Sequence, residues 1–147
     1  KGLAGFAVAA GILPLAPLAA VAADSSRNIL IAYFSHTGNT RTVAEMIHAA
    51  VGGDMFEIRA AEPYPSEHSA TERRARKEWE DNARPALAIE FPVDMSAYDA
   101  IFIGYPNWFR TTPMIVRTFL EQFGFAGKTL VPSARMEGMG LPTLRAI

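Results

Sequence analysis

The feature that most constrains the fold is an apolar strand pattern that runs into a polar turn and then into a helical pattern. Residues 28–34, Asn-Ile-Leu-Ile-Ala-Tyr-Phe, have the length of a strand and are rich in branched and aromatic side chains. Residues 35–40, Ser-His-Thr-Gly-Asn-Thr, have the composition of a turn. Apolar residues then recur at helical spacing, namely Val43, Met46, Ile47, Ala50 and Val51. The segment therefore predicts a β-strand, a tight loop and the start of an amphipathic helix.

The loop at residues 35–40 has the features of an anion-binding site. Free N–H groups and the positive end of the helix dipole point at a loop in this position. Ser35, Thr37 and Thr40 add hydroxyl donors, and Gly38 allows the backbone to approach a ligand closely. The loop has neither the lysine of a nucleotide-triphosphatase loop nor the three spaced glycines of a dinucleotide site. A hydroxyl-lined loop without cationic side chains suits one phosphomonoester; the alternative is a turn that only caps the helix.

The rest of the chain alternates between strand and helix patterns. Strands are predicted at residues 54–59, 98–105 and 128–132. Gly52 and Gly53 are predicted to end the first helix. This alternation predicts an α/β fold, with a doubly wound parallel sheet between two helical layers.

Two further helices are predicted between these strands. Residues 71–80 are mostly charged, with a capping box formed by Ser69 and Glu72 and with Trp79 as the large apolar anchor. We interpret this charge run as a solvated face rather than a binding surface. The other helix is predicted to begin at Thr112 and Pro113, as cap and first-turn proline.

A second loop is expected to face the first one at the same edge of the sheet. In doubly wound sheets, ligands bind outside the carboxyl ends of the strands. Tyr105, Trp108 and Phe109 follow such an end and offer aromatic faces for a planar ring, while Asn107 can bond its polar edge. Trp108 could instead only pack beneath the following helix. A phosphate loop and an aromatic wall on one crevice fit a flavin mononucleotide.

Composition excludes several classes of function. The absence of cysteine excludes disulfides, thiolate catalysis and sulfur-ligated metals. The net charge of −1 gives no indication of nucleic-acid binding. His36, His48 and His68 lack carboxylates at metal or triad spacing, so no metal ligand and no catalytic residue is predicted. We expect His36 to contribute to the first loop through its backbone rather than its ring.

Three motifs in this order resemble the flavodoxin family. Residues 35–40 resemble its FMN-phosphate loop. Residues 62–65, Glu-Pro-Tyr-Pro, with residues 81–85, and residues 104–109 with Pro113 and Met114, resemble segments of one branch of the family. The resemblance implies FMN as cofactor, held by Ser35, His36, Thr37, Gly38, Asn39, Thr40, Tyr105, Pro106, Asn107, Trp108 and Phe109. It also implies electron transfer to a redox partner protein. The alternatives are an FMN-dependent NAD(P)H:quinone-type reductase and a remnant that binds little flavin.

The N-terminal segment has the pattern of a targeting sequence. Residues 2–22 carry no charge, and small residues precede Asp24. We expect residues 1–23 to be a cleaved export signal, or else an uncleaved membrane anchor or a buried helix, and residues 24–147 to be the flavodoxin-like domain. This predicts a periplasmic or otherwise exported protein, with the twin-arginine route as one possibility. A membrane contact is expected only if the segment stays uncleaved.

The C-terminal segment departs from the family pattern. After Pro132 the resemblance implies a third flavin loop followed by a last helix and strand, but residues 133–140 read Ser-Ala-Arg-Met-Glu-Gly-Met-Gly. A codon set that permits this stretch reads, one base earlier, as the family loop Phe-Cys-Thr-His-Gly-Gly-His-Gly. The hypothesis is a frameshift at Ser133, which leaves the last strand and helix missing and the domain incomplete.

Overall fold

The computed structural model describes residues 27–88 and 94–135, as four strands, three α-helices and a short 3-10 turn. The elements follow one another along the chain as β1 (Ile29–Tyr33), α2 (Asn39–Val51), β2 (Asp54–Glu57), α3 (His68–Glu80), η1 (Met95–Ala97), β3 (Ala100–Pro106), α4 (Met114–Gln122) and β4 (Thr129–Arg135). The alternation of strand and helix predicted from the sequence is confirmed.

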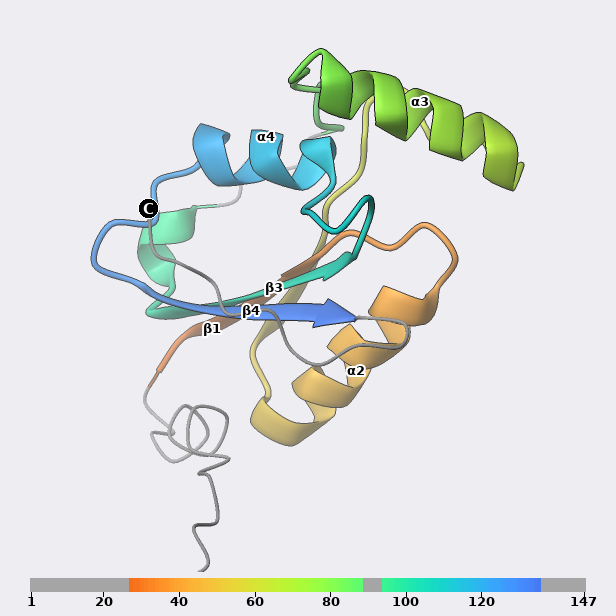
Figure 1. Ribbon diagram of the computed structural model, residues 1–147. Coiled ribbons are helices and arrows are strands. Elements are labelled where there is room, and N and C mark those ends of the chain that lie inside the picture. Colours follow the sequence, from red (N-terminus) through yellow and green to blue (C-terminus); the bar gives the residue numbers. More distant parts are fainter. Residues whose placement is uncertain (1–26, 89–93, 136–147) are drawn as a thin grey trace, which may run out of the picture.

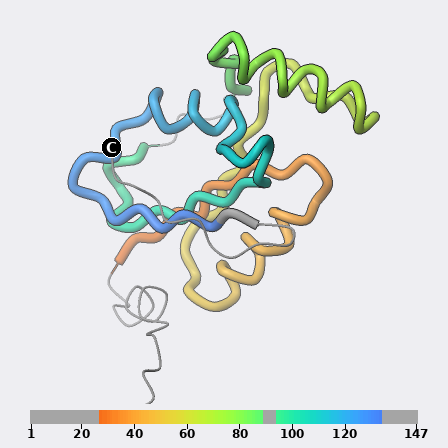
Figure 2. Tube along the Cα trace, in the orientation of Figure 1, coloured from red at the N-terminus to blue at the C-terminus, as the bar shows by residue number. Residues whose placement is uncertain are grey.

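The four described strands form one parallel sheet in the order β2-β1-β3-β4. From β1 the chain moves to one side of the sheet through β2 and to the other side through β3 and β4. Strand order therefore reverses between β1 and β3, which is where doubly wound sheets bind ligands. Figures 1 and 2 show α2 on one face of the sheet and α4, with α3 beyond it, on the other.

The two central strands are buried on both faces, as their continuous apolar runs predict. Alternate residues of β1 and β3 point to opposite sides and divide the core into two clusters. One cluster joins Leu30 and Ile103 to Ile115 and Phe119 of α4. The other joins residues such as Ile31 and Phe102 to Ala44, Ile47 and Val51 of α2. The sheet thus separates two independent apolar layers.

The buried face of α2 differs from the apolar stripe expected from the sequence. Thr40 and Ala44 are buried, whereas Met46 is 68% exposed. The face that meets the sheet is made by residues 40, 44, 47 and 51, whose spacing is also helical. The small residues Thr40 and Ala44 allow the start of α2 to lie close to the strands, whereas the larger side chain of Met46 remains in solvent.

The start of α3 and the role of Trp79 were predicted wrongly. The helix begins at His68, and the carboxylate of Glu67 accepts hydrogen bonds from the N–H groups of Ser69 and Ala70 at 2.8 and 2.7 Å. These bonds, with one from the Ser69 hydroxyl, hold the pKa of Glu67 below its ordinary value. Trp79 is 48% exposed, because the helix rests on its small residues Thr71 and Ala75.

The ends of two C-terminal elements also differ from prediction. Helix α4 begins at Met114 after Pro113, without a side-chain cap, so Thr112 does not cap it. Strand β4 extends to Arg135, where it pairs with Pro106, three residues beyond the predicted end. The predictions for residues 1–23 and for residues after 135 fall on parts of the chain outside the described ranges. Within those ranges, every helix is too short or too polar to cross a membrane.

Candidate ligand-binding site

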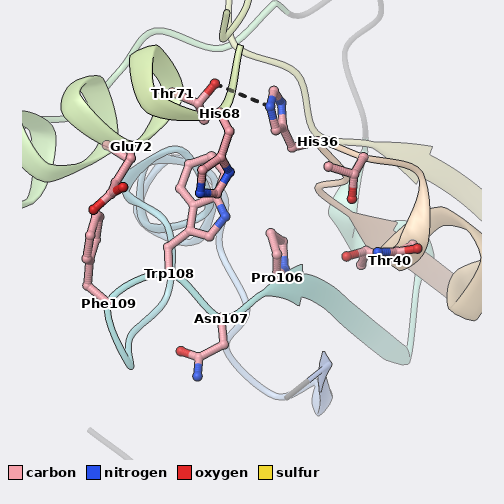
Figure 3. A pocket seen from close by; sticks show the side chains of 12 residues that line it. His36, Thr40, His68, Thr71, Glu72, Pro106, Asn107, Trp108 and Phe109 are labelled. Atoms are coloured by element: carbon pink, nitrogen blue, oxygen red, sulfur yellow. Dashed lines mark hydrogen bonds between the residues drawn. The ribbon is translucent and has the colours of Figure 1, made fainter. Parts of the chain in front are cut away.

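A cavity of about 740 Å³ lies at the carboxyl ends of β1 and β3 (Figure 3). Three segments line it: the loop between β1 and α2, the loop between β3 and α4, and the first half of α3. The lining residues are His36, Thr37, Asn39, Thr40, His68, Thr71, Glu72, Ala75, Pro106, Asn107, Trp108 and Phe109. Its volume falls in the range of pockets that hold small organic ligands and cofactors.

The N-terminus of α2 meets the cavity with some of its backbone N–H groups free. Gly38 precedes the helix with φ +88°, no side chain caps this end, and the first turn has no acidic residue. Within the described part of the chain, no hydrogen bond occupies the N–H of Thr37, Asn39 or Thr40. At the start of α3, by contrast, the Glu67 side chain accepts from the N–H groups of Ser69 and Ala70. The end of α2 is therefore prepared for an anion, and that of α3 is not.

The hydroxyls of this loop divide into two roles. The Oγ of Ser35 accepts the N–H of Arg41 at 3.1 Å, which fixes the loop against the first turn of the helix. Thr37 and Thr40 line the cavity, and their hydroxyls have no partner among the described residues. Thr40 is 4% exposed as a whole residue, so its position is set by packing.

A strained turn carries the aromatic residues of the second loop. Trp108 and Thr111 exchange backbone hydrogen bonds of 3.1 and 2.9 Å, and the two residues between them, Phe109 and Arg110, have φ of +51° and +62°. This is the geometry of a type I′ turn, which normally uses Asn or Gly. Each such non-glycine residue costs about 1–3 kcal/mol, and strain of this kind concentrates at functional sites. Arg117 holds the turn by donating to the Thr111 hydroxyl at 2.9 Å.

Trp108 both packs against other aromatic rings and lines the cavity. Its ring meets those of Phe34 and Tyr64 edge to face, with centroids 5.3 and 5.2 Å apart. It also lines the cavity beside Phe109. The indole is therefore a wall of the site whose orientation is fixed by the core behind it.

Contacts from the Glu-Pro-Tyr-Pro segment hold α3 beside the site. Arg74 of α3 donates to the carbonyl oxygens of Glu62 and Pro63 at 3.0 and 2.9 Å, and its guanidinium lies 4.2 Å from the centre of the Tyr64 ring. The Tyr64 hydroxyl donates to Glu78 at 2.6 Å. Burial and the neighbouring carboxylate raise the pKa of this phenol far above its ordinary value, so it stays protonated.

His36 links the first loop to α3 through its ring. The Thr71 hydroxyl donates its single hydrogen to the carbonyl oxygen of Pro65 at 2.5 Å. His36 Nε2 lies 3.3 Å from the hydroxyl oxygen of Thr71. Nε2 must then carry a hydrogen and donate it to Thr71. His36 was expected to contribute through its backbone rather than its ring; the structure adds that the ring lies at the cavity and makes this bond.

The predicted site residues fall into three groups. Those that line the cavity are His36, Thr37, Asn39, Thr40, Pro106, Asn107, Trp108 and Phe109. Ser35 and Gly38 shape the loop from outside the lining. Tyr105 was expected on the ligand but is buried in the core on the α4 face, because successive strand residues alternate between faces.

Sequence reasoning missed the wall provided by α3. His68, Thr71, Glu72 and Ala75 line the cavity, although the charge run of this helix was interpreted as a solvated face. The available signal was the pair Thr71 and Ala75, small residues one turn apart in a charged helix. Small residues at that spacing allow a helix to lie close to its neighbours.

Gly104 allows the first turn of α2 to approach the sheet, which gives a test of the site's geometry. A Cβ at this position would lie 3.1 Å from Tyr33 Cβ and 3.3 Å from Thr40 Cγ2. Tyr33 Cβ is fixed by its strand, so Gly104→Ala is expected to destabilise the protein by about 1–3 kcal/mol, as overpacking does. Urea denaturation measures this effect.

The matched control for this substitution is Gly124→Ala. A Cβ there meets nothing within 4 Å, and the residue has no positive φ. Its effect is expected within about 0.5 kcal/mol of zero. Equal stability of the two variants would contradict close packing between Thr40 and β3.

Comparison with known proteins places this geometry in a family. A flavodoxin family model matches residues 28–145. The structure is similar to that of a protein of Bacteroides eggerthii DSM 20697 named as a flavoprotein, with 42% identity, TM-score 0.67, and coverage of 74% of this chain and 70% of that one. A similarly named protein of Bacteroides uniformis ATCC 8492 has 36% identity, TM-score 0.66, and coverage of 74% and 71%.

A more distant structure shares the fold. It is a flavoprotein of Lactobacillus acidophilus NCFM in complex with FMN, with 21% identity, TM-score 0.63, and coverage of 75% of this chain and 93% of that one. No curated protein sequence matches the chain significantly. The extent of the family match and the parallel sheet beneath the site agree: this chain belongs to the flavodoxin family.

Proposed function

We propose that this protein binds FMN and carries electrons to a partner protein. The observation that carries the proposal is the uncapped N-terminus of α2, with the hydroxyls of Thr37 and Thr40, facing the same cavity as Trp108 and Phe109. One end of the cavity offers donors for a phosphate, and the other offers aromatic surface for a planar ring. FMN has both parts.

The residues present fit the phosphate of FMN. Its charge would be met by the free N–H groups of the first loop, the helix dipole and two hydroxyls, with no lysine or arginine in the lining. Gly38 lets the loop turn around the phosphate, since its φ of +88° is open to glycine at no cost.

The residues of the second loop fit the flavin ring. Trp108 and Phe109 would shield the ring from water, and the exposed amide of Asn107 could orient its polar edge. When bound, FMN supplies the redox chemistry, so the protein's part is to bind, orient and shield it. The FMN complex of the L. acidophilus protein, which shares the fold, supports the choice of cofactor.

The first test is the flavin content of the full chain. The purified protein is expected to be yellow, with flavin absorbance bands, and to release FMN into the supernatant on denaturation. Isothermal titration of flavin-free protein with FMN gives the affinity. A chain that carries no flavin and binds none on addition would contradict the proposal and favour a remnant with little flavin binding.

A second measurement separates a carrier from a reductase. A carrier is expected to reduce a protein acceptor such as cytochrome c only when a separate flavodoxin reductase supplies electrons. Steady consumption of NAD(P)H with a quinone, without any added protein, would instead favour the reductase alternative.

A further inference from the structure

An ion pair at the wall of the cavity is not accounted for by cofactor binding alone. Glu72 lines the cavity from α3, and its Oε1 accepts from Arg76 Nη2 at 2.9 Å, one helical turn away. The Arg76 guanidinium also lies 4.8 Å from the centre of the Phe109 ring. Figure 3 shows Glu72 and Phe109 among the residues that line the cavity. Arg76 thus joins α3 to the strained turn.

Glu72 and Arg76 place one fixed charge of each sign beside the aromatic end of the site. Among the described residues that line the cavity, Glu72 is the one with a fixed charge at neutral pH, since the others are neutral or histidine. Arg76 places a compensating charge behind Phe109. Both side chains are about half exposed, at 47% for Glu72 and 51% for Arg76, so solvent screens their fields without removing them.

We propose that the Glu72–Arg76 pair tunes the reduction potential of FMN bound in this cavity. The inference rests on the proposed function. Full reduction of FMN near neutral pH takes up two electrons from the reductant and one proton from solvent, and leaves the flavin with one additional negative charge. The positive charge of Arg76 favours that product, and the negative charge of Glu72 opposes it. Because the two charges nearly cancel, removing either one unmasks the other.

Two substitutions are therefore expected to act in opposite directions. Arg76→Gln is expected to weaken the binding of reduced FMN relative to oxidised FMN by about three- to fivefold, because a cation is lost and Glu72 is left unpaired. Glu72→Gln is expected to strengthen it by a similar factor. For a two-electron couple, a tenfold change in this ratio corresponds to about 29.6 mV. The reduction potential is therefore expected to fall by about 14–21 mV in Arg76→Gln and to rise by about 14–21 mV in Glu72→Gln.

Controls distinguish the field of this pair from general effects of charge. Lys77 of the same helix and Asp81, its C-cap residue, form an ion pair with the same spacing, with Nζ–Oδ2 2.6 Å, and neither residue lines the cavity. Lys77→Gln and Asp81→Asn are expected to leave the potential within a few millivolts of wild type. Arg76→Lys keeps the charge but loses the planar contact with Phe109. The reduction potential of FMN bound to this variant is therefore expected to stay closer to wild type than that of Arg76→Gln.

The experiment is a potentiometric titration of each FMN-loaded variant against a reference dye, with dithionite as reductant, at low and high salt. Opposite shifts for Glu72→Gln and Arg76→Gln that shrink at high salt support the proposal. Potentials equal to those of the Lys77 and Asp81 controls overturn it while FMN binding stands. If the wild-type chain binds no FMN, the proposed function itself has failed, which is a separate result.

Discussion

Riboflavin is expected to bind at least about a hundredfold more weakly than FMN. The two ligands differ by the phosphate, which in FMN would be held at the α2 N-terminus by free N–H groups and by Thr37 and Thr40. Hydrogen bonds to charged groups contribute about 1.5–3 kcal/mol each, so losing two of them weakens binding by two or more orders of magnitude. Titration of flavin-free protein with each ligand, followed by quenching of flavin fluorescence, measures the difference.

Thr40→Val assigns part of this difference to one hydroxyl. Valine keeps the methyl group that packs near Gly104 and replaces the hydroxyl with a methyl group of similar size. FMN is expected to bind about tenfold more weakly to this variant, and riboflavin about as well as to wild type. Thr118→Val is the control, because the Thr118 hydroxyl bonds the carbonyl of Met114 on α4, outside the lining. Equal affinity of the wild type for FMN and riboflavin would contradict the binding of the FMN phosphate at the α2 N-terminus.

The sheet was predictable because its pattern is local. The short apolar runs of β1 and β3, rich in branched and aromatic residues, are typical of strands covered on both faces. The ends of elements were less predictable. Glu67 caps α3 although Ser69 is the usual type of cap, and β4 continues to Arg135 because Gly104, Tyr105 and Pro106 offer it further pairing partners. Such choices depend on neighbours that are distant in the sequence.

The parts of the site that are formed by loops directly after a strand were predictable from the sequence. Residues 35–40 and 106–109 each follow a strand end, so their meeting at one edge follows from the topology. The wall from α3 depends on tertiary contacts that leave little trace in the sequence. Arg74 fixes the helix to two carbonyls, and Thr71 meets His36 across 35 residues. Tyr105 shows the reverse error, because an aromatic residue beside the site faces the core instead.

Gly53→Ala is expected to destabilise the protein by about 2–5 kcal/mol, the largest effect of any single methyl group considered. Gly53 has φ +90°, and a Cβ there would lie 2.5 Å from the carbonyl oxygen and 2.8 Å from the Cβ of Ile29. Positive φ costs about 1–2 kcal/mol for an L-residue, and overpacking against fixed backbone adds about 1–3 kcal/mol. Relief would require β2 to move away from β1 just before Leu30 pairs with Asp54. Gly127→Ala is the control, because it has φ +76° with nothing within 4 Å and isolates the cost of φ. Urea denaturation of both variants measures the difference, and equal losses would contradict the close approach of Gly53 to β1.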